Sequence, residues 1–87
     1  MAKNILGKVI LVSGAGGSIG AELVKQIMLQ GPKRIILVEM SEFALYKINE
    51  KVHKMVETEN LSTEVLPILC SVRNRSIIAK ILKLYQV

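Results

Sequence analysis

Three glycines and one acid have the types and the spacing to bind a dinucleotide. A β-branched apolar run ends in glycines at positions 14, 17 and 20, and a helical pattern then begins. Gly14 would let the chain turn sharply off a buried strand, and Gly17 would let the backbone approach a pyrophosphate closely. Gly20 would let the following helix pack tightly on the sheet. The phosphates would then lie on the amide groups at the N-terminus of that helix.

The acid is Glu39, which ends a second apolar run. It lies about 20 residues after Gly20, where a dinucleotide fold places the carboxylate that accepts hydrogen bonds from the adenosine ribose. Between the two runs stand an amphipathic stretch and a Gly31-Pro32 stop, as in a strand-helix-strand unit. A glycine turn followed by a chance acid leaves this context unexplained. A Walker-type phosphate loop fits worse, because no Gly-Lys-Ser/Thr ends the glycine segment.

The length and composition limit the chain to one small domain. With 87 residues it can bury only about 60–65 % of its unfolded surface. Hydrophobic residues make up 51 %, which suits a parallel sheet covered on both faces. No apolar run approaches the roughly 20 residues that span a bilayer, and the first residues lack the apolar stretch of a secretory signal. The sequence therefore predicts a cytoplasmic location and no membrane contact by this chain.

The net charge of +5 would attract anionic ligands and raises the question of a nucleic-acid partner. Lys47, Lys51 and Lys54 are spaced as the solvent face of a helix, and aromatic residues make up only 3 %. We therefore interpret the charge as solvated helix faces and expect no nucleic acid. The single cysteine, Cys70, excludes an internal disulfide and a cysteine metal cluster, and its apolar run places it in the core. The single histidine, His53, falls on a polar helix face and receives no role.

Three strand-helix units fit the pattern. We predict strands at residues 8–13, 34–39 and 64–70, and helices at residues 18–30, 42–59 and 74–84. Ser41 is the predicted N-cap of the second helix, and Pro67 places the third strand at the sheet edge. Strands that alternate with helices imply an α/β fold with a parallel sheet and right-handed crossovers. The prediction is a Rossmann-like sheet in the order 3-2-1, half of a doubly wound domain that spans residues 1–87.

Four stretches carry a resemblance to a known family: residues 7–20, 31–34, 41–46 and 66–73. They resemble the extended short-chain dehydrogenase/reductase superfamily. Within it they are similar to the CapD-like branch of polysaccharide biosynthesis, whose members are nucleotide-sugar 4,6-dehydratases and epimerases. The resemblance covers nearly the whole chain but only the beginning of the family's catalytic domain. It implies that residues 1–87 are part of an NAD-binding Rossmann domain.

The resemblance also implies which residues bind the cofactor. The glycine motif would hold the pyrophosphate, with amide groups from the start of the helix, and Glu39 would repel a 2′-phosphate and so favour NAD over NADP. Ser41 would lie beside the ribose. Where the family has Gly-Asp on the adenine, this chain has Cys70-Ser71, and Ser71 offers one hydrogen bond without charge. The full set of expected cofactor-binding residues is Gly14, Gly17, Ser18, Ile19, Gly20, Glu39, Ser41, Ser71 and Val72.

The activity of the family needs residues that the sequence does not supply. NAD removes a hydride from C4 of a UDP-sugar, water is lost across C5–C6, and the hydride returns. A lysine, a hydroxyl-bearing partner and acid/base groups are required, and the family places them after its fourth strand. Tyr46 has Glu50 four residues on rather than a lysine. We therefore expect no catalytic residue in this chain, and a UDP-sugar as substrate only of a longer protein.

Two other hypotheses stay open beside this NAD-binding portion of a dehydratase or epimerase of surface polysaccharide biosynthesis. One is a separate non-catalytic module that binds a nucleotide. The other is an interaction module whose first strand pairs with another chain, since that strand has a free edge in the order 3-2-1. The free edge predicts a homo-oligomer. Whether the longer relative is attached to a membrane is left open by the sequence.

Overall fold

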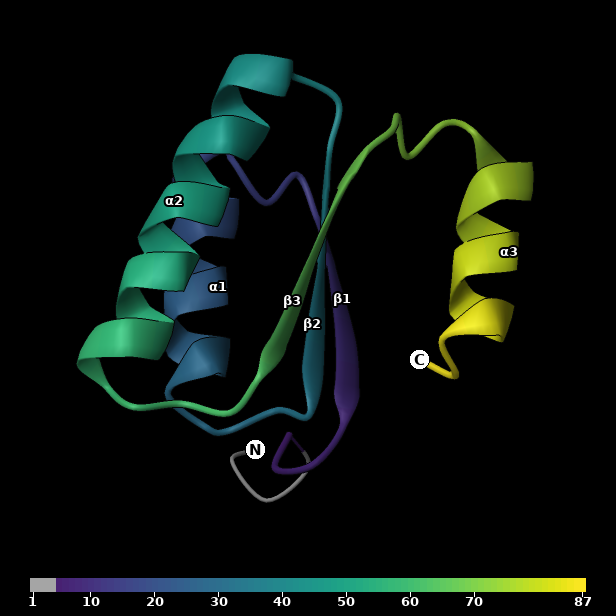
Figure 1. Ribbon diagram of the computed structural model, residues 1–87. Coiled ribbons are helices and arrows are strands. Elements are labelled where there is room, and N and C mark those ends of the chain that lie inside the picture. The colour runs from purple at the N-terminus through teal and green to yellow at the C-terminus, as the bar shows by residue number, and fades with distance from the viewer. Residues whose placement is uncertain (1–4) are drawn as a thin grey trace.

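The computed structural model describes residues 5–87, which form a three-stranded parallel sheet with helices on both faces (Figure 1). The elements in chain order are β1 (Val9–Ser13), α1 (Ser18–Met28), β2 (Arg34–Glu39), α2 (Glu42–Thr58), β3 (Glu64–Leu69) and α3 (Arg75–Leu84). The strands lie side by side in the order β1-β2-β3, and both neighbouring pairs are parallel. The predicted Rossmann-like half domain is confirmed. The largest difference in bounds is at α1, which ends at Met28 rather than at residue 30.

The central strand β2 explains why the sheet needs helices on both faces. Ile35 and Leu37 belong to one hydrophobic cluster with α1 and α2, whereas Ile36 and Val38 belong to a second cluster with α3. All four side chains are fully buried. Side chains alternate between the two faces of a strand, so an uninterrupted apolar run is stable only where both faces are covered.

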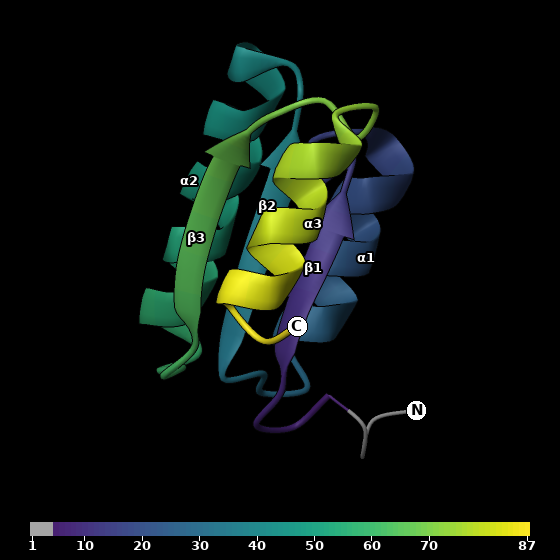
Figure 2. The same ribbon diagram turned by 90° about the vertical axis from the view of Figure 1, so that its right-hand side faces the viewer.

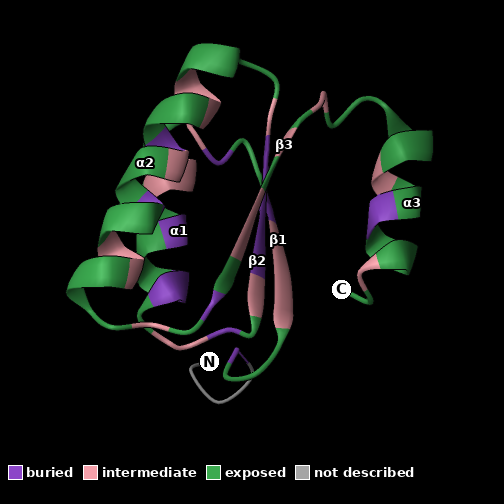
Figure 3. Cartoon of the chain, viewed as in Figure 1, coloured by how far each residue is buried: buried purple, intermediate pink, exposed green. Residues whose placement is uncertain are grey.

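The two helical layers are unequal. Helices α1 and α2 lie together on one face, and α3 lies alone on the other (Figures 1 and 2). The first layer buries Val24 and Met28 of α1 and Ile48 and Val52 of α2. In α3 only Ile81 is buried, and most of that helix is exposed in Figure 3. Because burial of apolar surface is the main favourable term in folding, the α1/α2 face supplies most of the stability.

The edge strand β3 is fixed at its start by polar contacts. Among the strands of residues 5–87 it pairs with β2 alone, where Pro67 lies opposite Leu37, and this agrees with the edge position predicted from Pro67. Just before β3, the buried hydroxyl of Thr63 donates to the carbonyl of Pro32 over 2.6 Å. Arg34, the first residue of β2, forms an ion pair with Glu64.

Among residues 5–87, no helix is both long enough and apolar enough to cross a membrane.

The buried Thr63 hydroxyl gives a test of this packing. Thr63→Val keeps the shape but leaves the Pro32 carbonyl without its donor, and we expect unfolding to need about 1–2 kcal/mol less free energy. Urea unfolding followed by circular dichroism measures the change. The exposed neighbour, in Ser62→Ala, is the control and should stay within about 0.5 kcal/mol of the parent. Equal stability of the two variants would contradict a stabilising role for the Thr63 hydrogen bond.

Candidate functional site

The loop between β1 and α1 makes the sharp turn expected from its first glycine. Gly14 has φ +62°, in the left-handed region that favours glycine. The turn is closed by the amide of Gly17, which donates to the carbonyl of Gly14 over 3.0 Å. The amide of Ala15 donates to the carbonyl of Val38 at the end of β2, over 3.2 Å. The loop is therefore held against the carboxyl edge of the sheet.

Two further glycines in this segment leave no room for a side chain. A Cβ atom on Gly20 would lie 2.0 Å from the carbonyl oxygen of Gly14, so α1 starts in direct contact with the loop. The close packing expected of Gly20 is present, but its partner is the loop rather than a strand of the sheet. A Cβ on Gly16 would lie 2.5 Å from the Cβ of Ala44 in α2. The sequence alone gives no role to Gly16, because this contact joins segments far apart in the chain.

Gly17 differs from Gly16 and Gly20, because its surroundings leave space for a Cβ atom. A Cβ there would meet only the Gly14 carbonyl oxygen, at 3.4 Å, an ordinary contact distance. Its backbone is extended, with φ −75° and ψ 168°. Within residues 5–87 no protein atom requires glycine at this position, so a requirement for glycine would come from something outside the chain. A ligand that approaches the backbone closely would impose it.

The carboxylate of Glu39 joins the loop to α2. Its Oε1 accepts the amide N–H of Gly16 over 2.9 Å, and its Oε2 accepts the amide N–H of Ser41 over 3.0 Å. The residue is half-buried at the end of β2. Each carboxylate oxygen has two lone pairs, so each can still accept a hydrogen bond from a hydroxyl group. The arrangement can therefore bind a diol without losing its structural contacts.

The N-terminus of α1 is left without a side-chain cap, in contrast to the other two helices. Ser41 caps α2, as predicted, by accepting the amide of Ala44 over 3.3 Å, and Asn74 caps α3 by accepting the amide of Ile77 over 3.3 Å. The N-cap of α1 is Gly17, which has no side chain, and the first turn of α1 contains no acid. Unpaired amides and the helix dipole favour an anion at such an end.

The remaining expected residues lie at the same edge of the sheet. Ser18 and Ile19 are the first two residues of α1 and are exposed. After β3, the hydroxyl of Ser71 accepts the amide of Arg73 over 3.2 Å, and Val72 is 53 % exposed. The carboxyl ends of parallel strands meet at one edge, so the structure brings the expected residues from all three loops to that edge.

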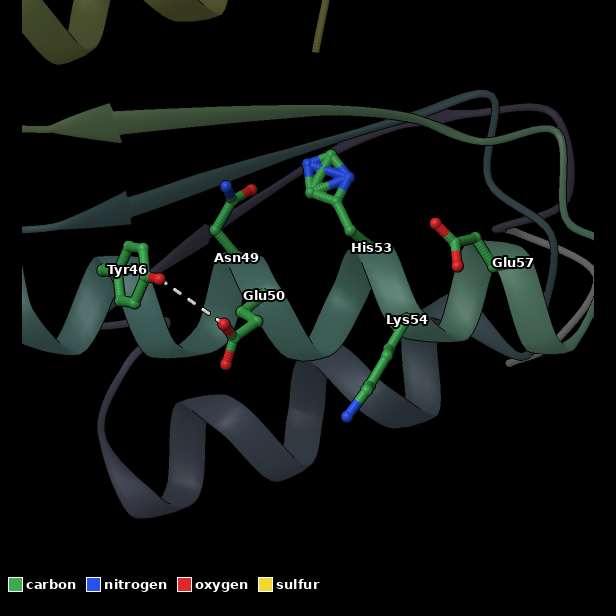
Figure 4. A pocket seen from close by; sticks show the side chains of 6 residues that line it. All are labelled: Tyr46, Asn49, Glu50, His53, Lys54 and Glu57. Carbon is green, nitrogen blue, oxygen red and sulfur yellow. Dashed lines mark hydrogen bonds between the residues drawn. The ribbon is translucent and has the colours of Figure 1, made fainter.

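Other candidates lie outside this edge. A shallow hollow of 350 Å³ on α2 is lined by six side chains of that helix alone, His53 among them (Figure 4). Within residues 5–87 no group of three His, Cys, Asp or Glu side chains is arranged to hold a metal ion. Cys70 is half-buried in the cluster on the α3 face and is a free thiol. Neither His53 nor Cys70 contributes to the candidate site.

Known proteins resemble this chain over most of its length. The model of a family described as "Polysaccharide biosynthesis protein" matches residues 10–87. The capsular polysaccharide biosynthesis protein CapD of Staphylococcus aureus is 33 % identical over 82 residues, which are 94 % of this chain and 13 % of that protein. The probable polysaccharide biosynthesis protein EpsC of Bacillus subtilis is 46 % identical over 48 residues, 55 % of this chain and 8 % of that protein.

A third relative comes from an archaeon. The uncharacterized membrane protein MJ1061 of Methanocaldococcus jannaschii is 39 % identical over 46 residues, which are 53 % of this chain and 14 % of that protein. The matched segments thus span less than a sixth of the length of each of these three relatives.

The contrast between Gly20 and Gly17 can be tested by stability. Gly20→Ala forces a Cβ against the Gly14 carbonyl, and we expect a loss of about 2 kcal/mol or more. Gly17→Ala places its Cβ at an ordinary contact distance and loses only the preference for glycine over alanine at an N-cap, so the loss should be about 1 kcal/mol or less. Urea unfolding of both variants under one set of conditions measures the difference. A Gly17 variant as unstable as the Gly20 variant would show that the loop itself requires both glycines.

Proposed function

The chain belongs to the polysaccharide biosynthesis protein family, and from this premise we propose that it is the NAD-binding portion of a nucleotide-sugar 4,6-dehydratase or epimerase of surface polysaccharide biosynthesis. One observation carries the proposal: the uncapped N-terminus of α1 adjoins the carboxylate of Glu39, through the 2.9 Å contact from Gly16. An anion-binding helix end beside a hydroxyl-binding carboxylate matches the two chemical parts of an adenosine diphosphate group.

In the proposed binding mode the glycine loop binds the pyrophosphate and the carboxylate of Glu39 binds the ribose. The pyrophosphate lies over Gly14, Gly17 and Gly20, with the amides of Ser18 and Ile19 as donors. The adenosine ribose donates its hydroxyls to the free lone pairs of the neighbouring carboxylate. Gly17 is the position where a side chain would meet the phosphates rather than the protein, because its Cβ is free of close protein contacts.

Glu39 is the proposed determinant of cofactor choice. Both of its oxygens are held by backbone amides, from Gly16 and Ser41, so the carboxylate has a fixed position. A 2′-phosphate on the ribose would bring a second negative charge into contact with it, and like charges in a partly buried site repel strongly. The proposed cofactor is therefore NAD rather than NADP.

The adenine ring has fewer proposed contacts than the pyrophosphate and the ribose. We assign the adenine ring to Ser71 and Val72, which follow β3. The Ser71 hydroxyl accepts the Arg73 amide with one lone pair, so its second lone pair is left to accept a hydrogen bond from the adenine amino group, and the exposed Val72 side chain offers an apolar contact. The Ser41 hydroxyl accepts the Ala44 amide and so caps α2, and its hydrogen is left to donate to the ribose.

Catalysis is assigned to residues outside this chain. NAD, when bound, supplies the hydride acceptor for oxidation at C4 of the sugar. Within residues 5–87, the Tyr46 hydroxyl contacts Glu50 at 3.5 Å, and the Tyr85 ring lies 5.4 Å from the guanidinium of Arg34 at the opposite end of the strands. Neither tyrosine stands beside a lysine at the candidate site. A UDP-sugar is thus proposed as substrate only of a longer protein that contains this chain, and a cytoplasmic location stays a prediction of the sequence.

Titration calorimetry with NAD and NADP tests the cofactor assignment. We expect NAD to bind at least about tenfold more tightly than NADP, a difference of about 1.4 kcal/mol, because Glu39 repels the added phosphate. Gly17→Ala should abolish binding while it stays folded. Glu39→Gln, which removes the charge, should reduce the preference for NAD. Tighter binding of NADP by the parent chain would contradict the role given to Glu39.

Assays of the purified chain with UDP-sugars and NAD test the catalytic assignment. We expect no dehydrated or epimerised sugar above the background of the assay, since we assign the groups that move protons to residues outside this chain. Mass spectrometry of the sugar nucleotide is the measurement. Product that elutes with this chain on a sizing column would overturn the assignment.

The open edge of β1 supports a proposed homo-oligomer. β1 pairs with β2 on one side, and no strand of residues 5–87 pairs with its other side. Unpaired backbone groups at a strand edge are a template for another strand. Light scattering should therefore give a molar mass above the 9.6 kDa of one chain at high micromolar concentration. A stable monomer whose β1 amides exchange slowly with solvent would refute this proposal.

A further inference from the structure

A continuous groove runs along the seam between α1 and α2, on the outer face of their layer. Its middle part, 200 Å³, has buried apolar side chains at its base, Val24 from α1 and Ile48 and Val52 from α2. A part of 180 Å³ extends it toward Phe43 and a part of 290 Å³ toward Leu29. Adjoining parts share lining residues, so the three form one channel that follows the two helices.

Four lysines line this groove, Lys25 from α1 and Lys47, Lys51 and Lys54 from α2, and one acid, Glu59, lines its end toward Leu29. All four are exposed, and Figure 4 shows Lys54 directed toward α1, away from Asn49. Within the described part of the chain, none of the four ammonium groups has a carboxylate within 4.0 Å. We call this feature the lysine-rimmed groove.

Two of these lysines repel each other within α2. Lys47 and Lys51 are one helical turn apart, and like charges at that spacing destabilise a helix. Lys25 adds a third positive charge from the other side of the groove. The Lys47 ammonium lies 5.0 Å from the centre of the Phe43 ring, its one aromatic contact among residues 5–87. An anionic group in the groove would relieve this repulsion.

The shape of the groove decides which anionic partner fits. A concave apolar base between charged rims matches an amphipathic helix whose apolar stripe is flanked by acids. A flat bilayer surface would meet the lysines and leave the base uncovered. A nucleic acid would supply charge but no apolar ridge for the base. The observations thus favour a helix over both alternatives.

We propose that the lysine-rimmed groove is a docking site for an acidic amphipathic helix of a partner protein. Apolar residues of that helix would cover the exposed Phe43 and Leu29 at the two ends and the half-buried Ala21 and Met55 between them, and so supply affinity. Its carboxylates would pair with the four lysines and set its orientation. The groove lies on the α1/α2 layer and uses neither Glu39 nor the amides of α1. The proposal therefore stands independently of NAD binding and goes beyond the proposed function.

The probe for this proposal is a fluorescein-labelled helical peptide with leucines at positions i, i+3, i+4 and i+7 and glutamates on either side. We expect saturable binding to the full chain by fluorescence anisotropy, and a loss of affinity of about fivefold or more at about 0.5 M salt, where exposed charges are screened. The double variant Lys25→Glu with Lys51→Glu should bind about tenfold more weakly.

The matched control is Lys80→Glu with Lys83→Glu on α3, which changes the net charge equally at exposed positions on the other face. It should bind the peptide as the parent does, and circular dichroism should show that both double variants fold. Three outcomes would overturn the proposal: no saturable binding, an equal loss in both double variants, or binding of the chain to anionic phosphatidylglycerol vesicles that depends on Lys25 and Lys51 while the peptide does not bind.

Discussion

The carboxylate of Glu39 is the interaction on which the candidate site depends. It accepts amide hydrogens from Gly16 in the first loop and Ser41 at the start of α2, and so joins two segments that the chain separates by a helix and a strand. Each contact is a charge-assisted hydrogen bond, stronger than one between neutral groups, and the Gly16 contact is half-buried whereas the Ser41 contact is exposed. Because β2 carries this residue at its last position, the register of the sheet sets where the loop and the helix meet.

Close backbone contact is the second constraint at this edge. Gly16 touches Ala44 and Gly20 touches the Gly14 carbonyl, so a Cβ at either glycine would displace backbone. These contacts hold α1 and α2 near the loop and leave the end of α1 with its amides unpaired. A site for an anion thus results from packing that excludes side chains, together with the absence of a cap.

The α1/α2 layer combines two kinds of surface. Its inner side supplies most of the buried apolar contacts of the sheet. Its outer side carries the lysine-rimmed groove, which sequence patterning had assigned simply to a solvated helix face. The α2 lysines are exposed, in agreement with that interpretation, but Lys25 of α1 faces them across an apolar base. Helix periodicity shows which residues of one helix share a face, whereas the charge opposite them depends on how two helices pack.

The sequence by itself determined the element order, the parallel sheet, the cap at Ser41 and the edge position of β3. These follow from local rules: periodicity, turn residues, and the conformational limits of glycine and proline. It also placed Gly14, Gly17, Gly20 and Glu39 at one edge, since the carboxyl ends of parallel strands coincide. Only the tertiary structure decided that Gly16 binds Glu39 and touches Ala44, that Gly20 packs on the loop, and that Lys25 joins the lysines of α2. Those contacts join residues distant in the chain, and their distances depend on how the helices pack on the sheet, which no local pattern of residues encodes.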